Sequence, residues 1–203
     1  MIELKNITYS YGEKTVLDGV NLSVAAGEKI GIVGESGSGK STLIKLISGL
    51  YRVQSGELEV GGDVAVVMQS LSLFPLTIRE NITCGHDVAE EKLWQAVRIA
   101  QLEDWVDSLP NGLDTFVGER GGGVSGGQAQ RISVARAIAK GAPVLILDEA
   151  TSALDGQTAE KLMGALEGWW KDRTVISIAH RAEALSRCKR IYSLEGGKLC
   201  LKN

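Results

Sequence analysis

A glycine-rich segment at residues 34–41, which follows a short apolar run and precedes a stretch of helical periodicity, constrains this chain more than any other feature. Its residues match the pattern GxxxxGK[ST] and are Gly34, Glu35, Ser36, Gly37, Ser38, Gly39, Lys40 and Ser41. The run at 29–33 predicts a short buried strand, and residues 41–48 predict the helix that follows. A glycine-rich turn between a strand and a helix is typical of a phosphate-binding loop.

The residue types of this segment suit an anion at the start of a helix. Its glycines allow a tight turn in which successive backbone N–H groups point at one anion, and the helix start adds partial positive charge. We expect Lys40 to reach the β- and γ-phosphates of a nucleotide and the Ser41 hydroxyl to hold Mg²⁺. Thr42 supplies a further hydroxyl near the expected α-phosphate.

An acidic pair ends a second apolar run. Residues 144–147 are typical of a central parallel strand, and Asp148 and Glu149 follow directly. Asp148 is expected to bind the metal, either directly or through water. Glu149 is then available to accept a proton from an attacking water, or to orient that water.

A third apolar run, at residues 174–178, ends at Ala179 and His180. Ligands of open α/β sheets bind at the carboxyl ends of the strands, which is where the three motifs are expected to lie. A histidine is more often structural than chemical, but this position favours His180 as a contact of the γ-phosphate or the attacking water. We assign no role to His86.

A second anion site is predicted at Ser125-Gly126-Gly127. Ser125 is a good N-cap for the helix predicted at 127–140, which ends at Gly141 before Pro143. Two phosphate receptors in one chain can serve two ligands, or one ligand held between two chains. The residues themselves leave both arrangements open.

With these motifs in this order, the whole chain resembles the nucleotide-binding domain of an ATP-binding cassette (ABC) transporter. The residues that carry the resemblance are the glycine-rich segment, Gln69, Val124-Ser125-Gly126-Gly127-Gln128, Leu147-Asp148-Glu149, Ser152-Ala153-Leu154-Asp155 and His180. The resemblance implies an α/β fold with a P-loop NTPase (RecA-like) core around a mostly parallel sheet. A small antiparallel β-subdomain and an inserted α-helical lobe are expected beside this core.

The resemblance also implies the ligands and their arrangement. Two such domains pack head to tail, and each ATP with its Mg²⁺ lies between one domain's glycine-rich segment and the other's Ser125 to Gln128. Tyr11 falls where the family stacks an aromatic ring on adenine, with Tyr9 as a neighbouring candidate. Gln69 is expected to touch Mg²⁺ or water, and Asp155 to couple the two sites across the dimer.

Two segments indicate the transporter subtype. Residues 117–121, just before the second anion site, resemble the segment with which exporter-type cassettes contact transmembrane domains, and residues 77–82 point the same way. The chain departs from the family pattern at Val124, at Ala129 and in the short segment 57–69. This shortening is similar to cassettes whose catalytic position is often degenerate, but Glu149 is retained here and predicts hydrolysis.

We expect a single domain over residues 1–203, with an ATP-binding core at 1–69 and 142–203 and a helical lobe at 70–141. The lobe includes a helix predicted at 89–101. A hydrophobic share of 44% is ample for a core of this size. No apolar run approaches the ~18 residues of a membrane span, so transport requires transmembrane domains from another chain or from a removed part of this one.

The expected function is Mg²⁺-dependent ATP hydrolysis in a head-to-tail dimer that powers export of an unknown substrate. The chain is expected at the cytoplasmic face of a membrane, held there by its transmembrane partner. A net charge of −3 offers no broad basic face for nucleic acid. The cysteines Cys84, Cys188 and Cys200 are odd in number and well separated in the sequence, which indicates reduced thiols.

Two rival functions come from other classes. A soluble cassette ATPase of DNA repair usually has a long coiled coil or zinc insert, and one of translation carries two cassettes; this sequence has neither feature. A regulatory module that closes on ATP but turns over poorly usually lacks the residue at Glu149 or at His180, and both are present.

Overall fold

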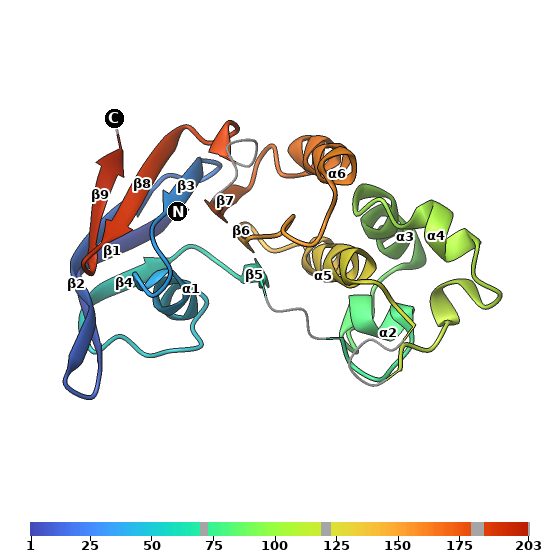
Figure 1. The fold of residues 1–203 in the computed structure, drawn as a ribbon, viewed down its shortest axis with the longest axis horizontal. Coiled ribbons are helices and arrows are strands. Elements are labelled where there is room, and N and C mark those ends of the chain that lie inside the picture. Colours follow the sequence, from blue (N-terminus) through green and yellow to red (C-terminus); the bar gives the residue numbers. More distant parts are fainter. Residues whose placement is uncertain (70–72, 119–122, 180–184, 203) are drawn as a thin grey trace. The chain divides into compact units, whose positions relative to one another are not determined.

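The computed structural model describes residues 1–69, 73–118, 123–179 and 185–202 (Figure 1). By its internal contacts the chain divides into two compact units. The first unit contains Met1–Val66, Pro143–Asp148 and Asp172–Asn203, and the second contains Val67–Ala142 and Glu149–Lys171. Each unit is therefore assembled from segments that are distant in the sequence.

The first unit is built on a six-stranded sheet with the order β5-β6-β7-β3-β8-β9 (Figure 1). Its strands are β3 (Lys29–Val33), β5 (Val64–Val67), β6 (Val144–Asp148), β7 (Thr174–Ile178), β8 (Arg190–Glu195) and β9 (Lys198–Lys202). The strands β6, β7, β3 and β8 run parallel, whereas β9 pairs antiparallel with β8. Every residue of β6 and β7 is buried, as is typical of central parallel strands. The predicted mostly parallel sheet is confirmed.

The first unit also contains the helix α1 (Lys40–Ile47) and a small antiparallel sheet with the order β2-β1-β4. The strands of this sheet are β1 (Ile2–Tyr11), β2 (Lys14–Val24) and β4 (Ser55–Val60). A register shift lies between Leu4 and Ile7, where Asn6 has a φ of 51°. Because an extra residue in a strand returns the next side chain to the same face, both Leu4 and Ile7 are buried. This sheet confirms the expected small β-subdomain.

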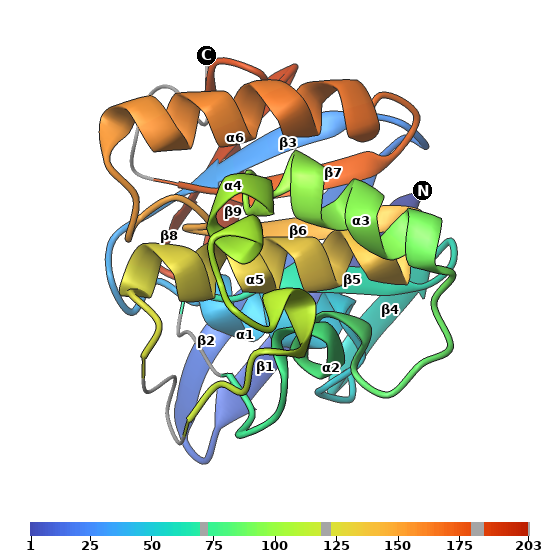
Figure 2. The same cartoon turned by 90° about the vertical axis from the view of Figure 1, so that its right-hand side faces the viewer.

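The second unit is helical. Its elements are α2 (Ile78–Thr83), α3 (Glu90–Ile99), α4 (Glu103–Asp107), the 3₁₀ helix η1 (Gly112–Asp114), α5 (Gly126–Lys140) and α6 (Gly156–Trp169). The helix α5 lies beside α2 and α3, and α3 also contacts α6 (Figure 2). Most side chains of α5 are small, and buried residues occur on most of its sides. It is therefore the central helix of this unit.

The grouping of α6 differs from the division expected from the sequence. Glu149–Lys171 belongs to the second unit by its contacts, whereas the sequence-based division placed it with residues 142–203 in the core. The physical reason is the packing of α6 against α3, which periodicity along the chain does not indicate. The helices predicted at 127–140 and 89–101 form at Gly126–Lys140 and Glu90–Ile99.

An arginine of β8 connects the two sheets of the first unit. Arg190 Nε and Nη2 donate to the two carboxylate oxygens of Glu28, each at 2.7 Å, and Nη2 also donates to the Ser23 carbonyl at 2.7 Å. The Glu28 side chain is only 11% exposed. Hydrogen bonds from Arg190 hold the pKa of Glu28 below its usual value, against the effect of burial.

Replacing Arg190 by alanine is expected to lower the free energy of unfolding by about 2–3 kcal/mol at pH 7, because it leaves a largely buried carboxylate without its cation and with the Ala25 N–H as a remaining donor. Glu28 has a lowered pKa in the folded state, so the stability from this pair is full above the unfolded pKa of 4.5 and is lost as the pH falls through the folded pKa. Urea unfolding of both proteins between pH 3 and pH 7 measures this difference.

The exposed pair of Lys198 and Asp18 is the matched control. Its atoms are 3.8 Å apart and both side chains are more than half exposed, so Lys198→Ala is expected to cost less than about 1 kcal/mol. If Lys198→Ala and Arg190→Ala lower the free energy of unfolding equally, the burial of Glu28 adds nothing to the stability that its ion pair provides.

Candidate functional site

The glycine-rich segment connects β3 to α1 (Lys40–Ile47) in the first unit. Gly37 and Gly39 have φ angles of 80° and 108°, which side chains disfavour. A Cβ on Gly34 would lie 2.4 Å from the Leu194 carbonyl oxygen. Glycine is therefore required at these positions by the path of the backbone, as the motif predicts.

Three side chains of the segment present polar atoms around this backbone. Lys40 Nζ donates to the carbonyls of Gly34 at 2.6 Å and Glu35 at 2.7 Å, so the ammonium group lies against the segment. Among the described residues, the buried Ser38 hydroxyl has no hydrogen-bond partner. Ser41 is exposed at the helix start. An unpartnered buried hydroxyl in the same turn as a lysine, just before the start of a helix, suits an anionic ligand.

Tyr11 belongs to a cluster of aromatic rings in the first unit. The rings of Tyr9 and Tyr51 stack at 5.5 Å with an interplanar angle of 11°, and Tyr11 meets both edge-on. The Tyr11 hydroxyl lies 3.3 Å from the Thr42 hydroxyl of α1. Tyr11 is 46% exposed, whereas Tyr51 covers one face of Tyr9. Of the two candidates, Tyr11 therefore has the more accessible ring.

A lysine on α1 adds charge to this cluster. Lys45 Nζ donates to the Tyr51 hydroxyl at 3.3 Å and lies 5.0 Å from the centroid of its ring. Hydrogen bonding with Tyr11, and then with Lys45, lowers the pKa of Tyr51. The cluster is thus tied to α1 by polar contacts as well as by ring packing.

Asp148 is the last residue of β6 and is buried. The strand register pairs it with Ile178 of β7, and Ile178 pairs in turn with Ile32 of β3. Since β3 leads directly into the glycine-rich segment, Asp148 and Gly34 lie at the same edge of the sheet with one strand between them. His180, predicted to follow β7, lies outside the described residues.

Glu149, the predicted proton acceptor, begins the next segment of the second unit. Gln69 Nε2 donates to its Oε2 at 2.7 Å, although 80 residues separate the two. Glu149 has a φ of 50°, a left-handed conformation that is unfavourable for residues other than glycine. The structure thus brings two predicted site residues together at a backbone position that is strained.

The second predicted anion site is the start of α5. Ser125 caps this helix: its hydroxyl accepts from Gln128 N at 3.2 Å, and Gln128 Oε1 accepts from Ser125 N at 2.7 Å. Ser125 and Gly126 are exposed. A Cβ on Gly127 would lie 3.2 Å from Leu154, so a larger residue would press on the neighbouring turn. The Gln128 side chain has a capping role that the motif alone does not indicate.

Asp155 caps the following helix, α6. Its Oδ1 accepts from Thr158 N at 3.0 Å. Hydrogen bonds from this backbone N–H and from the Thr158 side chain lower the pKa of Asp155. The predicted coupling residue is therefore an ionised N-cap in the same unit as Ser125 and Glu149.

Gln130 is a site-adjacent residue that the sequence interpretation did not include. Its side chain is fully buried in α5 and donates to the Glu149 carbonyl. The sequence could have indicated this role. Gln130 precedes Val134 by four residues and Ala137 by seven, so a polar residue lies on a helix face that is otherwise apolar and buried.

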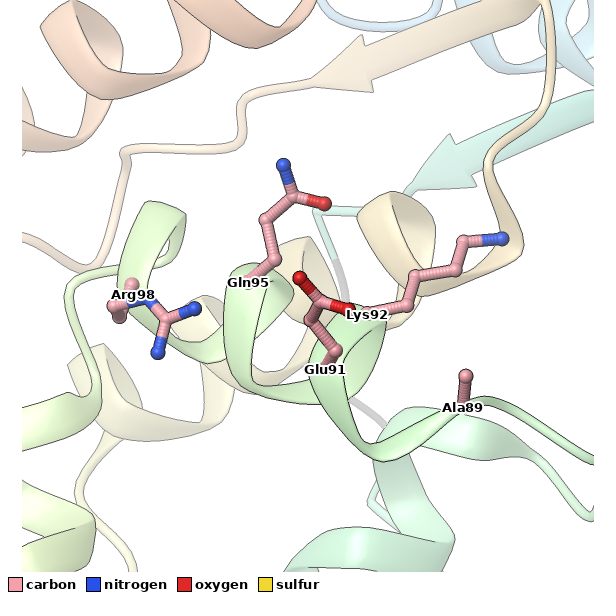
Figure 3. A pocket seen from close by; sticks show the side chains of 5 residues that line it. All are labelled: Ala89, Glu91, Lys92, Gln95 and Arg98. Atoms are coloured by element: carbon pink, nitrogen blue, oxygen red, sulfur yellow. The ribbon is translucent and has the colours of Figure 1, made fainter.

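A shallow hollow on α3 is separate from these residues. It has a volume of about 350 Å³ and is lined by Ala89, Glu91, Lys92, Gln95 and Arg98 (Figure 3). None of the predicted site residues belongs to this lining within the described part of the chain. We assign it no role in the candidate site.

Comparison with known proteins places these observations in a family. The family model described as ABC transporter matches residues 17–152. An ATP-dependent lipid A-core flippase of Burkholderia pseudomallei is 41% identical over 98% of this chain and 36% of its own length. One of Desulfotalea psychrophila is 42% identical over 98% of this chain and 37% of its own length.

A solved structure agrees with these relatives. The structure of a bacterial Atm1-family ABC exporter with ATP bound superposes with a TM-score of 0.92 at 34% identity, and covers 98% of this chain and 38% of its own. The chain thus spans little more than a third of the length of the proteins it matches. Together with the glycine-rich segment, the acidic strand end and the capped helix start, these matches show that the chain belongs to the ABC transporter family, as a nucleotide-binding domain of the exporter type.

Proposed function

We propose that this chain binds and hydrolyses ATP and that the hydrolysis powers export through transmembrane domains. The observation that carries the proposal is the glycine-rich segment, in which the backbone path excludes a side chain on Gly34 and the Lys40 ammonium lies against the turn. A backbone of this shape brings N–H groups close to a phosphate chain. The whole chain, residues 1–203, acts as one such ATPase domain.

The metal of the reaction is Mg²⁺, bound through Ser41, Asp148 and Gln69. The side-chain oxygens of these residues are the donors that Mg²⁺ prefers, and Asp148 lies at the sheet edge from which the glycine-rich segment leaves. When bound, Mg²⁺ neutralises charge on the β- and γ-phosphate oxygens. Ser41 and Asp148 hold it beside the phosphates that Lys40 contacts.

Glu149 is the general base of the proposed hydrolysis. It accepts a proton from the water that attacks the γ-phosphate in line, and the Gln69 amide orients its carboxylate through the 2.7 Å hydrogen bond. His180 contacts the γ-phosphate or the attacking water. Catalysis consists mainly of positioning and charge stabilisation, as is usual for phosphoryl transfer.

Each ATP contacts two domains: the one whose glycine-rich segment binds it, and a second copy of this domain or a similar domain. In a head-to-tail dimer, the exposed Ser125, with Gly126, Gly127 and Gln128, meets the γ-phosphate bound by the other domain. The start of a 15-residue helix supports this role, because its first amides and its dipole favour an anion. Asp155 transmits the state of one site to the other.

The transmembrane partner contacts exposed apolar side chains of the second unit. The exposed fractions are 49% for Phe74, 40% for Leu76 and 63% for Phe116. An isolated antiparallel β-bridge pairs Thr77 with Phe116. These residues lie in or beside the segments expected to face the transmembrane domains. Within the described residues, no helix of this chain is both long and apolar enough to span a bilayer. The proposed location, at the cytoplasmic face of a membrane, rests on the proposed contact of these exposed side chains with the transmembrane partner.

Phosphate release from ATP tests the proposed function. The purified chain is expected to release phosphate when Mg²⁺ is present and to stop when EDTA is added. Binding of ATP without phosphate release, alone or with transmembrane domains, would contradict hydrolysis and favour the regulatory module. Stimulation by DNA in place of transmembrane domains would favour a cassette ATPase of DNA repair.

Replacing Tyr11 by alanine is expected to weaken ATP binding by about 10-fold, because stacking of an aromatic ring on a base is worth roughly 1–3 kcal/mol. Tyr11→Phe keeps the ring and is expected to bind ATP nearly as well as the wild type. Equilibrium dialysis with ATP measures both variants. Equal affinity for Tyr11→Ala and the wild type would transfer the adenine contact to Tyr9.

A further inference from the structure

We propose that Gln130 is a positioning residue that holds Glu149 in its left-handed conformation and fixes it to helix α5. The inference rests on the proposed function, since Glu149 is the proposed general base. In the proposed dimer, Glu149 acts on the ATP of its own chain and the start of α5 meets the ATP of the partner chain. The buried Gln130 amide would connect these two elements.

The side chain of Gln130 makes hydrogen bonds at both of its polar atoms. Nε2 donates to the Glu149 carbonyl at 3.0 Å and to the Ser152 hydroxyl at 3.3 Å, and Oε1 accepts from Ala153 N at 2.9 Å. One side chain thus binds both ends of the turn at 149–153. All of these contacts lie within the second unit.

Burial makes these hydrogen bonds consequential. Gln130 is 0% exposed, so water does not compete at its amide, and a variant without the amide leaves the Glu149 carbonyl without this donor and Ala153 N without this acceptor. The Glu149 carbonyl also accepts from Ser152 N at 2.9 Å, which closes the turn but does not attach it to α5. Gln130 adds hydrogen bonds that connect this turn to the helix.

The strained backbone of Glu149 explains why such attachment is needed. A left-handed φ at a residue other than glycine persists only when surrounding contacts impose it. The carboxylate direction follows from this φ, and Gln69 contacts the carboxylate at the other end of the residue. Gln130 fixes the backbone and Gln69 fixes the side chain.

The same turn contacts the first residues of α5. A Cβ on Gly127 would lie 3.3 Å from the Ala153 carbonyl and one on Gly126 would lie 3.8 Å from the Ala153 side chain, so the helix start packs on the turn directly. In the proposed dimer the start of α5 meets the ATP of the partner, whereas Glu149 serves the ATP of its own chain. Gln130 therefore couples the two ATP sites through one chain.

Three variants test this role. Gln130→Met keeps the length of the side chain and removes its hydrogen bonds, and we expect it to lower kcat by about 10–100-fold through misplacement of Glu149. The KM for ATP is expected to change by less than about 2-fold, since ATP binds mainly to the glycine-rich segment. Ser133→Ala, a buried polar change in the same helix, is the matched control and is expected to retain kcat.

The third variant, Gln130→Glu, separates positioning from a general loss of packing. Only a protonated carboxyl can both donate to the Glu149 carbonyl and accept from Ala153 N. Relative to the wild type, the kcat of Gln130→Glu is therefore expected to recover as the pH falls. A residue that only filled space would produce no such recovery.

Hydrogen exchange of the amides at 150–155 supplies a readout that is independent of turnover. Gln130→Met is expected to lose protection there, because Ala153 N loses its acceptor. Wild-type kcat in Gln130→Met, or unchanged exchange, would overturn the inference. A wild-type chain that releases no phosphate would instead contradict the proposed function, while the exchange measurement would still decide on Gln130.

Discussion

Glu149→Gln is expected to lower the rate of ATP hydrolysis by at least about 100-fold, because removal of a general base typically costs 10²–10⁴-fold. The substitution keeps an oxygen that can accept from Gln69 and leaves the glycine-rich segment intact. ATP binding is therefore expected to persist, and the unhydrolysed nucleotide is expected to hold two domains together. Sedimentation velocity with and without Mg-ATP measures this dimer.

Glu160→Gln provides the matched control for this experiment. Glu160 is an exposed acid on α6 in the same unit, and we expect its variant to hydrolyse ATP at the wild-type rate and to remain monomeric after turnover. A wild-type hydrolysis rate in Glu149→Gln would remove the assignment of the general base. Loss of turnover without any dimer would show that closure depends on the transmembrane partner or on a different second domain.

Lys40→Ala is expected to weaken ATP binding by about 10–100-fold, since a hydrogen bond to a charged group is worth roughly 1.5–3 kcal/mol. Lys40 Nζ donates to the Gly34 and Glu35 carbonyls, so the ammonium group is held at the turn where the phosphates are proposed to bind. Titration calorimetry with ATP and Mg²⁺ measures the change in affinity.

Two further variants show whether this effect is local. Lys5→Ala removes an exposed lysine of β1, 4.0 Å from Glu57, and is expected to leave ATP affinity unchanged. Lys40→Arg keeps the charge but replaces a compact ammonium by a planar fork, and is expected to bind ATP less tightly than the wild type. If Lys40→Ala binds ATP as tightly as the wild type, Lys40 is not a phosphate ligand.

Local sequence patterns were sufficient to predict the elements that position the phosphate site. The glycine-rich segment and the apolar runs at 29–33 and 174–178 each specify a strand or a turn from neighbouring residues alone. The strand that ends at Asp148 was equally predictable, because its side chains are all apolar up to the acid. These features depend on the local conformation of the backbone, which the sequence determines within a few residues.

Contacts between distant residues could not be predicted in the same way. The left-handed φ of Glu149 and its hydrogen bond from Gln69, 80 positions earlier, have no signal in local periodicity. Gln130 contacts a partner 19 positions further along the chain, and the residue pattern of its own helix does not specify that contact. The grouping of α6 with α3 likewise follows from packing that only the folded chain creates.

The close approach of Gly34 to Leu194 has a consequence for the order in which this chain matures. The turn proposed to receive the phosphates is bounded by a carbonyl of β8, and Val33 of β3 pairs with Ser193 of β8. A nascent chain that has completed every motif therefore still lacks one wall of the turn until β8 joins the sheet. Because a ligand stabilises only the state that binds it, ATP can favour folding of this domain only at a late step of its synthesis.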